Sequence, residues 1–265
     1  MGSNVSSAGK VGYAMRGAQV LESMDENSTA DWIGRQVEVR FDGLIHCVVT
    51  GKQIRKTYGE GMSYDAFVKS PLACPSIIRP ELSRIHEGIA LRDEAWEREH
   101  HLAPHILYVS QTSHLKVGVT RASNVPSRWV DQGAVGAIVV AKVPYRQLAG
   151  EMEVALKEHF SDKTHWRNML SEVVMDEDQL VQAKDHALDC LGSPYESFFE
   201  DDDEPVELRY PVEMYPSKVN SVKLDKTPHF SGRLVGIKGQ YWMFEDGRVW
   251  NIRSHAGYRV RLEIS

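Results

Sequence analysis

The chain has 265 residues, a net charge of -6, 42% hydrophobic and 26% charged residues, an ordinary composition for a folded protein. No run approaches the ~18 consecutive apolar residues that a membrane span needs. The first ten residues lack the apolar core of a signal peptide, so we expect a cytoplasmic protein with no membrane partner. The three cysteines (Cys47, Cys74 and Cys190) are far apart and odd in number, which argues against a disulfide framework.

Charge is unevenly distributed along the chain. Residues 171–207 hold 1 basic and 13 acidic side chains, whereas residues 105–170 hold 8 and 5, and residues 208–265 hold 10 and 5. Two segments are therefore basic although the whole chain is acidic, which is compatible with a polyanionic partner. The same distribution also fits a solvated acidic linker beside ordinary protein surface.

Residues 1–103 predict a β-rich module. Polar and apolar residues alternate over Gln36–Phe41, and Asp42-Gly43 is typical of a hairpin turn into a second strand at residues 44–49. The pair His100-His101, just before Pro104, is expected at the surface.

Residues 104–170 alternate between strand and helix patterns. We predict strands at residues 105–110, 115–120 and 135–143. A short helix is expected to begin with Asn124 as its cap and Pro126 in its first turn, and to end at Gly133. A second helix is expected over residues 145–160, with a core stripe formed by Met152, Ala155, Leu156 and Phe160.

The last two segments differ in composition. Residues 171–207 predict a helix at Glu177–Leu191 followed by an acidic linker that includes residues 200–205. Residues 208–265 predict a small β-barrel of the SH3-like or OB kind. Its strands are expected at residues 232–237, 240–244, 248–252 and 258–264, and Asp246-Gly247 is expected to form a hairpin turn.

Several motifs of the sequence resemble known families. LKVGVTR (115–121), RWVDQGA (128–134), DKTHWRNML (162–170) and GIKGQY (236–241) resemble an uncharacterised family of bacterial proteins that has no established activity. ILY (106–108) and KVG (116–118) resemble the paired strand motifs of GIY-YIG nuclease domains. The expected fold is therefore α+β, with a GIY-YIG-like three-stranded α/β core between the N-terminal β-rich module and the C-terminal barrel.

The resemblance to GIY-YIG domains implies a Mg²⁺-dependent endonuclease that cleaves phosphodiester bonds. It implies that Tyr108 assists the deprotonation of water, that Arg128 neutralises the phosphate, and that Glu153 binds the metal. Lys116 replaces the tyrosine of the second motif. Because a lysine contacts phosphate but does not replace a phenol as a proton relay, this departure weakens the expectation of catalysis.

Each of the three residues also has a structural interpretation. Tyr108 would be a strand tyrosine packed at a sheet edge, Arg128 would pair with Asp131, and Glu153 would pair with Lys157 one helical turn away.

The first functional hypothesis is a nucleic-acid-binding protein, for DNA or RNA. Its phosphate contacts would come from Lys116, Arg121, Arg128, Lys163 and Arg167, with Trp166 in an aromatic rim. Lys238 and Arg248, with Tyr241, Trp242 and Arg253, would extend this surface over the barrel. The alternatives are the endonuclease and a non-catalytic protein-interaction module in which the acidic residues 171–207 shield the basic face. The sequence does not indicate an oligomeric state.

The resembled bacterial family carries CxxC-like pairs in its N-terminal region, consistent with zinc. In this chain Thr50 and Ile77 stand where second cysteines would follow Cys47 and Cys74, which leaves a degenerate zinc-ribbon-like segment. Two cysteines and scattered histidines fall short of a thiolate-rich four-ligand site, so no zinc is expected there.

Overall fold

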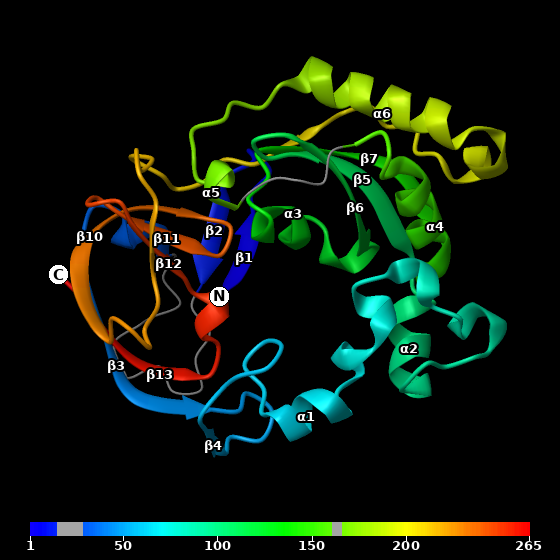
Figure 1. Cartoon of the computed structure of the whole chain (residues 1–265). Helices are drawn as coiled ribbons and strands as arrows, with labels where there is room; N and C mark the ends of the chain where they lie inside the picture. Colours follow the sequence, from blue (N-terminus) through cyan, green and yellow to red (C-terminus); the bar gives the residue numbers. More distant parts are fainter. Residues whose placement is uncertain (15–28, 161–165) are drawn as a thin grey trace. The chain divides into compact units, whose positions relative to one another are not determined.

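The computed structural model describes residues 1–14, 29–160 and 166–265. The chain has a mixed α+β fold and divides into two compact units (Figure 1). Unit 1 comprises residues 1–69, 170–172 and 209–265, and unit 2 comprises residues 70–169 and 173–208. These units differ from the four predicted segments because N-terminal and C-terminal strands share one sheet. None of the described helices is both long and apolar enough to cross a membrane.

The main sheet of unit 1 is an open, curled sheet, in contrast to the small barrel that the strand pattern predicts (Figure 1). Its strand order is β13-β3-β10-β11-β12-β9, and β4 pairs with β3. The bounds are β3 Gln36–His46, β4 Gln53–Ile54, β9 Asn220–Val222, β10 His229–Lys238, β11 Tyr241–Phe244, β12 Arg248–Asn251 and β13 Tyr258–Ile264. β1 (Gly2–Val5) and β2 (Val11–Ala14) form a separate ribbon. The four C-terminal strands and the Asp246-Gly247 turn between β11 and β12 are thus confirmed.

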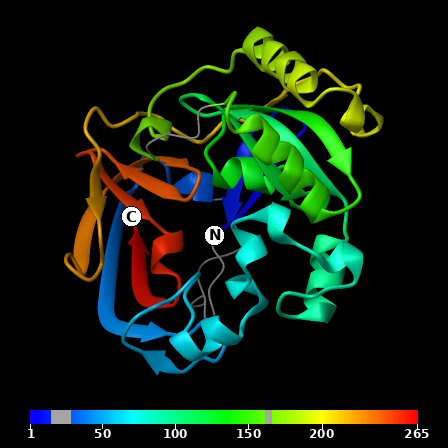
Figure 2. The same ribbon diagram turned by 45° about the vertical axis from the view of Figure 1, so that its right-hand side comes forward.

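β3 continues through Asp42-Gly43, so the predicted hairpin turn is wrong. Gly43 has a φ of +84°, and Asp42 Oδ1 accepts a hydrogen bond from the amide of Leu44 at 3.1 Å. The register between β3 and β13 shifts at this point, which is a β-bulge. Because β10 and β13 pair with β3 on its two edges, long-range pairing overrides the local turn signal, and β3 appears as one long, bent strand in Figure 2.

Aromatic side chains fill the core of unit 1. Trp242 meets Trp32 and Trp250 edge to face, with ring centroids 5.5 Å apart in both pairs. Phe230 packs in the same way on Phe244 at 5.3 Å. Such edge-to-face pairs add to the stabilisation from apolar burial.

Unit 2 contains a four-stranded antiparallel sheet in the order β6-β5-β7-β8. The strands are β5 His105–Gln111, β6 Leu115–Arg121, β7 Gly136–Val143 and β8 Val206–Glu207. α4 (Arg146–Leu156) and α6 (Glu177–Leu191) cover one face, where Leu107 and Val109 join a shared apolar core. α3 (Ser127–Asp131) lies on the other face, as Figure 1 shows. The three predicted strands of the central segment and the helix at Glu177–Leu191 are confirmed.

Two details of the predicted helices are wrong. Asn124 ends a 3₁₀ turn and Pro126 occupies the N-cap position of α3, so Asn124 does not cap this helix. α4 ends at Leu156 instead of residue 160, and Ala155 is exposed, whereas Phe160 turns back onto the core after the helix has ended.

The remaining elements of the described chain are short. The α-helices are α1 Tyr64–Lys69, α2 Glu94–His101 and α5 Trp166–Met169. The 3₁₀ helices are Thr29–Trp32, Pro71–Ala73, Pro75–Ile77, Pro80–Leu82, Ile85–Glu87, Ala122–Asn124, Ser193–Phe198 and Arg253–His255. The histidine pair at the end of α2 is not a surface pair, because His101 is 2% exposed and its Nδ1 lies 3.2 Å from the Ser83 hydroxyl.

Residues 201–204, in the acidic segment after α6, have exposed side chains, but hydrogen bonds hold the backbone of this segment in place. Lys184 on α6 is 1% exposed, and its ammonium donates to the carbonyls of Glu200 and Asp202 and to the carboxylate of Asp203. The amide of Glu200 donates to the carbonyl of Val140 at 3.0 Å. A buried lysine and a strand of the sheet therefore hold this part of the predicted linker against unit 2.

Candidate functional site

Tyr108 is fixed in the interior of unit 2. It pairs with Gly118 of β6 and lies on β5, a central strand, so it is not packed at a sheet edge. The side chain is 1% exposed, its hydroxyl donates to Gln132 Oε1 at 2.9 Å, and its ring meets Trp129 at 5.8 Å. α3 thus positions the phenol from the face of the sheet opposite to α4 and α6.

Arg128 and Glu153 act electrostatically on this phenol. Burial raises the pKa of Tyr108 above its ordinary value, and the negative charge of Glu153 adds to that increase. The positive charge of Arg128 opposes it, and so does the hydrogen bond between the phenol and Gln132. Glu153 is partly exposed on α4 and Arg128 is exposed on α3. The charges of both act on Tyr108, so the three residues named by the sequence are coupled electrostatically.

Arg146, at the start of α4, belongs to the same group. Its guanidinium donates to the carbonyls of Ser76 and Ile77, at 2.9 Å in both cases. Burial lowers the pKa of Arg146, the carboxylate of Glu153 opposes this, and the positive charges of Arg121 and Arg128 lower the pKa further. We call Arg121, Arg128 and Arg146 the arginine cluster. No sequence motif marks Arg146, since only folding brings it to the other two.

Two buried histidines border the arginine cluster. The pKa of His101 and that of His105 both fall to about 4, mainly because burial disfavours the imidazolium, and the charges of Arg146 and Arg121 lower them further. Both rings are therefore neutral at neutral pH, and the net positive charge of the site comes from the arginines.

The structure distributes the other predicted contact residues of unit 2 as follows. Lys116 lies two residues before Gly118 on β6, so it projects from the face of the sheet that carries Tyr108. Arg167 stacks over the ring of Trp166 on α5, with its Cζ 4.5 Å from the ring centroid. Lys163 lies outside the described residues.

Unit 1 exposes fewer of the predicted nucleic-acid-binding side chains than the sequence suggests. Lys238 and Trp242 are fully buried, and burial lowers the pKa of Lys238 to about 8. The Lys238 ammonium donates to the carbonyl of Ser171 and faces the rings of Tyr210 and Tyr215, so it does not form part of the surface. Arg248 is partly exposed, and its guanidinium is held by Asp246 and the carbonyl of Ser231, both at 2.6 Å.

The cysteines of the degenerate zinc-ribbon-like segment are buried free thiols. Cys47 in unit 1 is 1% exposed, and Cys74 in unit 2 is 3% exposed and lies 3.0 Å from the Ser76 hydroxyl. The pKa of the Cys47 thiol is lowered to about 6, mainly by Thr50, which stands where a second cysteine would follow, and also by backbone amides, while burial opposes this decrease.

A family model described as a protein of unknown function (DUF2797) matches residues 34–260. The chain belongs to the DUF2797 family. The matched range covers most of both units, including the arginine cluster, Tyr108 and Glu153. No curated protein and no solved structure matches this DUF2797 chain significantly.

The chemistry of the site in this DUF2797 protein follows from its charges. Arg146 interacts electrostatically with Arg121, Arg128 and Glu153, and the neighbouring histidines are neutral, so positive charges outnumber negative charges in this group. Guanidinium groups present paired N–H donors that match the oxygens of a phosphate. The arrangement is thus suited to an anion with several oxygens. The phenol of Tyr108 interacts electrostatically with Arg128, and the carboxylate of Glu153 does so with Arg146.

Proposed function

We propose that this protein binds nucleic acid and that unit 2 contacts the phosphates through the arginine cluster. The observation that carries the proposal is the electrostatic interaction of Arg146 with Arg121, with Arg128 and with the carboxylate of Glu153. Arg128 is exposed and Arg121 is partly exposed, so both can reach a ligand. Arg146 is held by hydrogen bonds to backbone carbonyls, so it adds positive charge to the cluster from a fixed position. Neutralising phosphates with such groups releases counterions and makes binding dependent on salt.

The order of elements supports a GIY-YIG-like interpretation of this unit. A hairpin (β5 and β6), a short helix (α3), a third strand (β7) and a second helix (α4) follow each other along the chain. Tyr108 lies on the first strand, Arg128 on the first helix and Glu153 on the second helix, as the resemblance implies. DNA and RNA share the phosphate chemistry on which the proposal rests.

Binding is tested with the full chain and fluorescently labelled single-stranded DNA, duplex DNA and RNA between 50 and 200 mM salt, a range over which phosphate contacts lose much affinity. We expect Arg121→Gln and Arg128→Gln each to weaken binding and to reduce the slope of log affinity against log salt by about 1. Arg84→Gln is the matched control, since Arg84 is an exposed arginine of unit 2 that pairs with Glu87. Absence of binding, or equal slopes for all variants, would overturn the proposal.

A second candidate function is Mg²⁺-dependent cleavage of the bound phosphodiester. The observation that favours it is the electrostatic coupling of Tyr108 with both Arg128 and Glu153, which gathers a phenol, a cation and a carboxylate. The carboxylate of Glu153 interacts with Arg146, so it fits Mg²⁺ only together with phosphate oxygens, which is a usual mode of Mg²⁺ binding. Mg²⁺ bound by Glu153 would neutralise charge on the phosphate. Tyr108 would hold a proton near the attacking water, and Arg128 would orient the phosphate.

Cleavage and binding are separated by Glu153→Gln. This variant removes the carboxylate from the arginine cluster, so we expect unchanged or tighter binding of nucleic acid together with loss of about 10²-fold or more in Mg²⁺-stimulated cleavage. Tyr108→Phe should lower cleavage at unchanged affinity. Cleavage that persists in Glu153→Gln, or that does not require Mg²⁺, would exclude this mechanism and would leave the binding proposal intact.

A further inference from the structure

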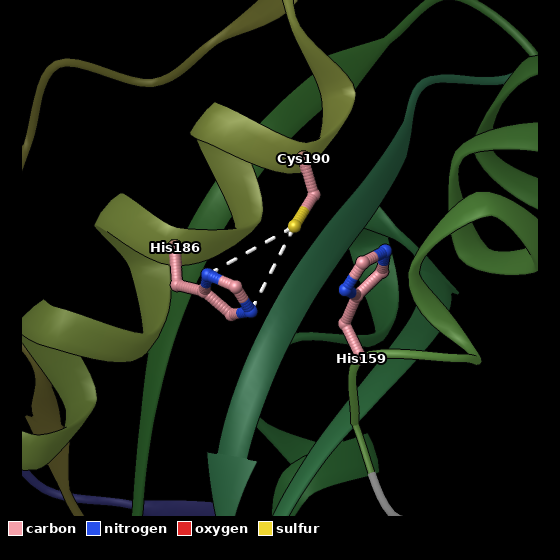
Figure 3. A group of neighbouring side chains, drawn as sticks. All are labelled: His159, His186 and Cys190. Carbon is pink, nitrogen blue, oxygen red and sulfur yellow. Dashed lines mark hydrogen bonds between the residues drawn. The ribbon is translucent and has the colours of Figure 1, made fainter.

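Three potential metal ligands from two parts of unit 2 converge near the ends of α4 and α6 (Figure 3). His186 and Cys190 lie four residues apart on α6, so both project from the same side of that helix. His159 follows the end of α4 and approaches them from the neighbouring segment. One ligand atom from each residue lies within 4.8 Å of the others.

The spacing is close to that of a tetrahedral zinc site. Zn–N distances of about 2.05 Å and a Zn–S distance of about 2.3 Å place nitrogen and sulfur ligands about 3.5 Å apart. Cys190 Sγ lies 3.7 Å from His186 Nε2 and 3.9 Å from His186 Nδ1, so this pair nearly has the required separation. The rings of His159 and His186 lie 5.6 Å apart between centroids, and all three ligand atoms lie within 4.8 Å of one another, so a rotation of the exposed His159 side chain would complete the set.

The electrostatic surroundings favour a cation at this place. Cys190 lies in the last turn of α6, and His159 lies just beyond the last turn of α4. The negative ends of two helix dipoles thus lie near the ligands. Exposed acidic residues adjoin all three of them in the sequence: Glu158, Asp185 and Asp189.

The three residues differ in burial in a way that suits a metal site at the surface. Both histidines are exposed, so an ion can reach them, whereas Cys190 is partly buried and packs on the core of unit 2. The ring of Phe160 lies 5.8 Å from that of His186 and restricts it from one side. Cys190 is therefore anchored by packing, His186 is partly restrained, and His159 can change its side-chain conformation.

We propose that His159, His186 and Cys190 form a Zn²⁺ site with three protein ligands and water in the fourth position. Two imidazoles and one thiolate are ligands typical of Zn²⁺. The ion would displace the proton of Cys190 and connect α6 to the segment that follows α4. The site is separate from the Cys47 and Cys74 segment, where no zinc is expected, and the proposal does not rest on the proposed nucleic-acid function.

Cobalt(II) is the probe, because a cobalt–thiolate bond gives a charge-transfer absorption that requires a cysteine ligand. Titration of the reduced full chain should give this band at one cobalt per chain, and one equivalent of Zn²⁺ should remove it. Cys190→Ser should abolish the band. His159→Ala and His186→Ala should each weaken cobalt binding by at least about tenfold, because even the loss of a residue that only hydrogen-bonds to a metal ligand typically lowers affinity by that factor.

Two control variants make the result specific. Cys47→Ser removes the thiol whose pKa falls to about 6, and His114→Ala removes an exposed histidine of unit 2. Both should keep the cobalt band. Zn²⁺ should also raise the unfolding temperature of the wild type and of these controls but not that of Cys190→Ser. The absence of a thiolate band, or a band that survives in Cys190→Ser and disappears in Cys47→Ser, would overturn the proposal.

Discussion

The phenol ring of Tyr108 lies across the backbone of Gly118 on the neighbouring strand, so closely that a Cβ on Gly118 would stand 2.7 Å from both Cζ and Oη of the tyrosine. The tyrosine of ILY and the glycine of KVG are thus one steric unit, paired in register across β5 and β6. The glycine is needed because the ring occupies the space of a side chain, and the charges of Arg128 and Glu153 in turn act on the phenol.

Gly118→Ala should therefore destabilise unit 2 by about 1–3 kcal/mol, the range typical of overpacking a core. Tyr108→Ala removes the ring, so the double variant should cost less than the sum of the two single changes, as measured by urea unfolding. Leu107 projects from the opposite face of β5, and Leu107→Ala should combine additively with Gly118→Ala. Additive costs in the Tyr108 pair would contradict the steric explanation.

Stability should fall as the pH decreases from 7 to 5 because of His101 and His105. Their pKa values are about 4 in the folded protein against 6.5 for an unperturbed imidazole, so the unfolded state gains most of the protons in this range. The contribution of each histidine is fully present above pH 6.5 and is lost as the pH falls towards 4. For one histidine the loss between pH 7 and 5 is about 2 kcal/mol.

His105→Gln should reduce by about one the number of protons taken up on unfolding, and so lower the slope of the free energy of unfolding against pH. Urea unfolding at several pH values measures this slope. His114→Gln is the control, since His114 is exposed. If the two variants show equal slopes, His105 is not buried in its neutral form.

Lys184 should contribute much more stability than its ion pair suggests. The Lys184→Met variant keeps most of the side-chain volume but leaves the carbonyls of Glu200 and Asp202 without this donor, which should cost about 2–4 kcal/mol. Asp203 is 63% exposed, so Asp203→Asn should cost less than about 1 kcal/mol. Urea unfolding measures both, and hydrogen exchange at the Glu200 amide should accelerate only in Lys184→Met. Similar costs for the two variants would refute the role given to the carbonyls.

Gly150→Ala should destabilise the protein although alanine normally stabilises a helix by about 0.5–1 kcal/mol relative to glycine. A Cβ at Gly150 would lie 2.3 Å from the amide nitrogen of Glu81 and 2.6 Å from the carbonyl carbon of Pro80. These are backbone atoms, so they cannot rotate away, and we expect a net cost of about 1–3 kcal/mol. Val154→Ala on the exposed side of α4 is the control and should be neutral or slightly stabilising. A stabilised Gly150→Ala variant would show that this contact is looser than described.

The sequence by itself determined the elements whose signals are local. Alternation and apolar runs located β5, β6, β7 and the C-terminal strands, and Asp-Gly marked the turn before β12. The helix predicted at Glu177–Leu191 is α6. The motifs also identified Tyr108, Arg128 and Glu153, which interact electrostatically in the folded protein. The sequence predicts these elements because each signal depends on residues within a few positions of one another.

Tertiary structure decided what depends on distant partners. β3 continues through Asp42-Gly43 because β10 and β13 pair with it, and the same pairing joins the two ends of the chain in unit 1. Lys238 has the charge of a surface residue but is buried beside tyrosines, and Arg146 joins the arginine cluster from another element. Burial and side-chain proximity arise from contacts between remote segments, and for this reason no local pattern predicts His159 beside His186 and Cys190.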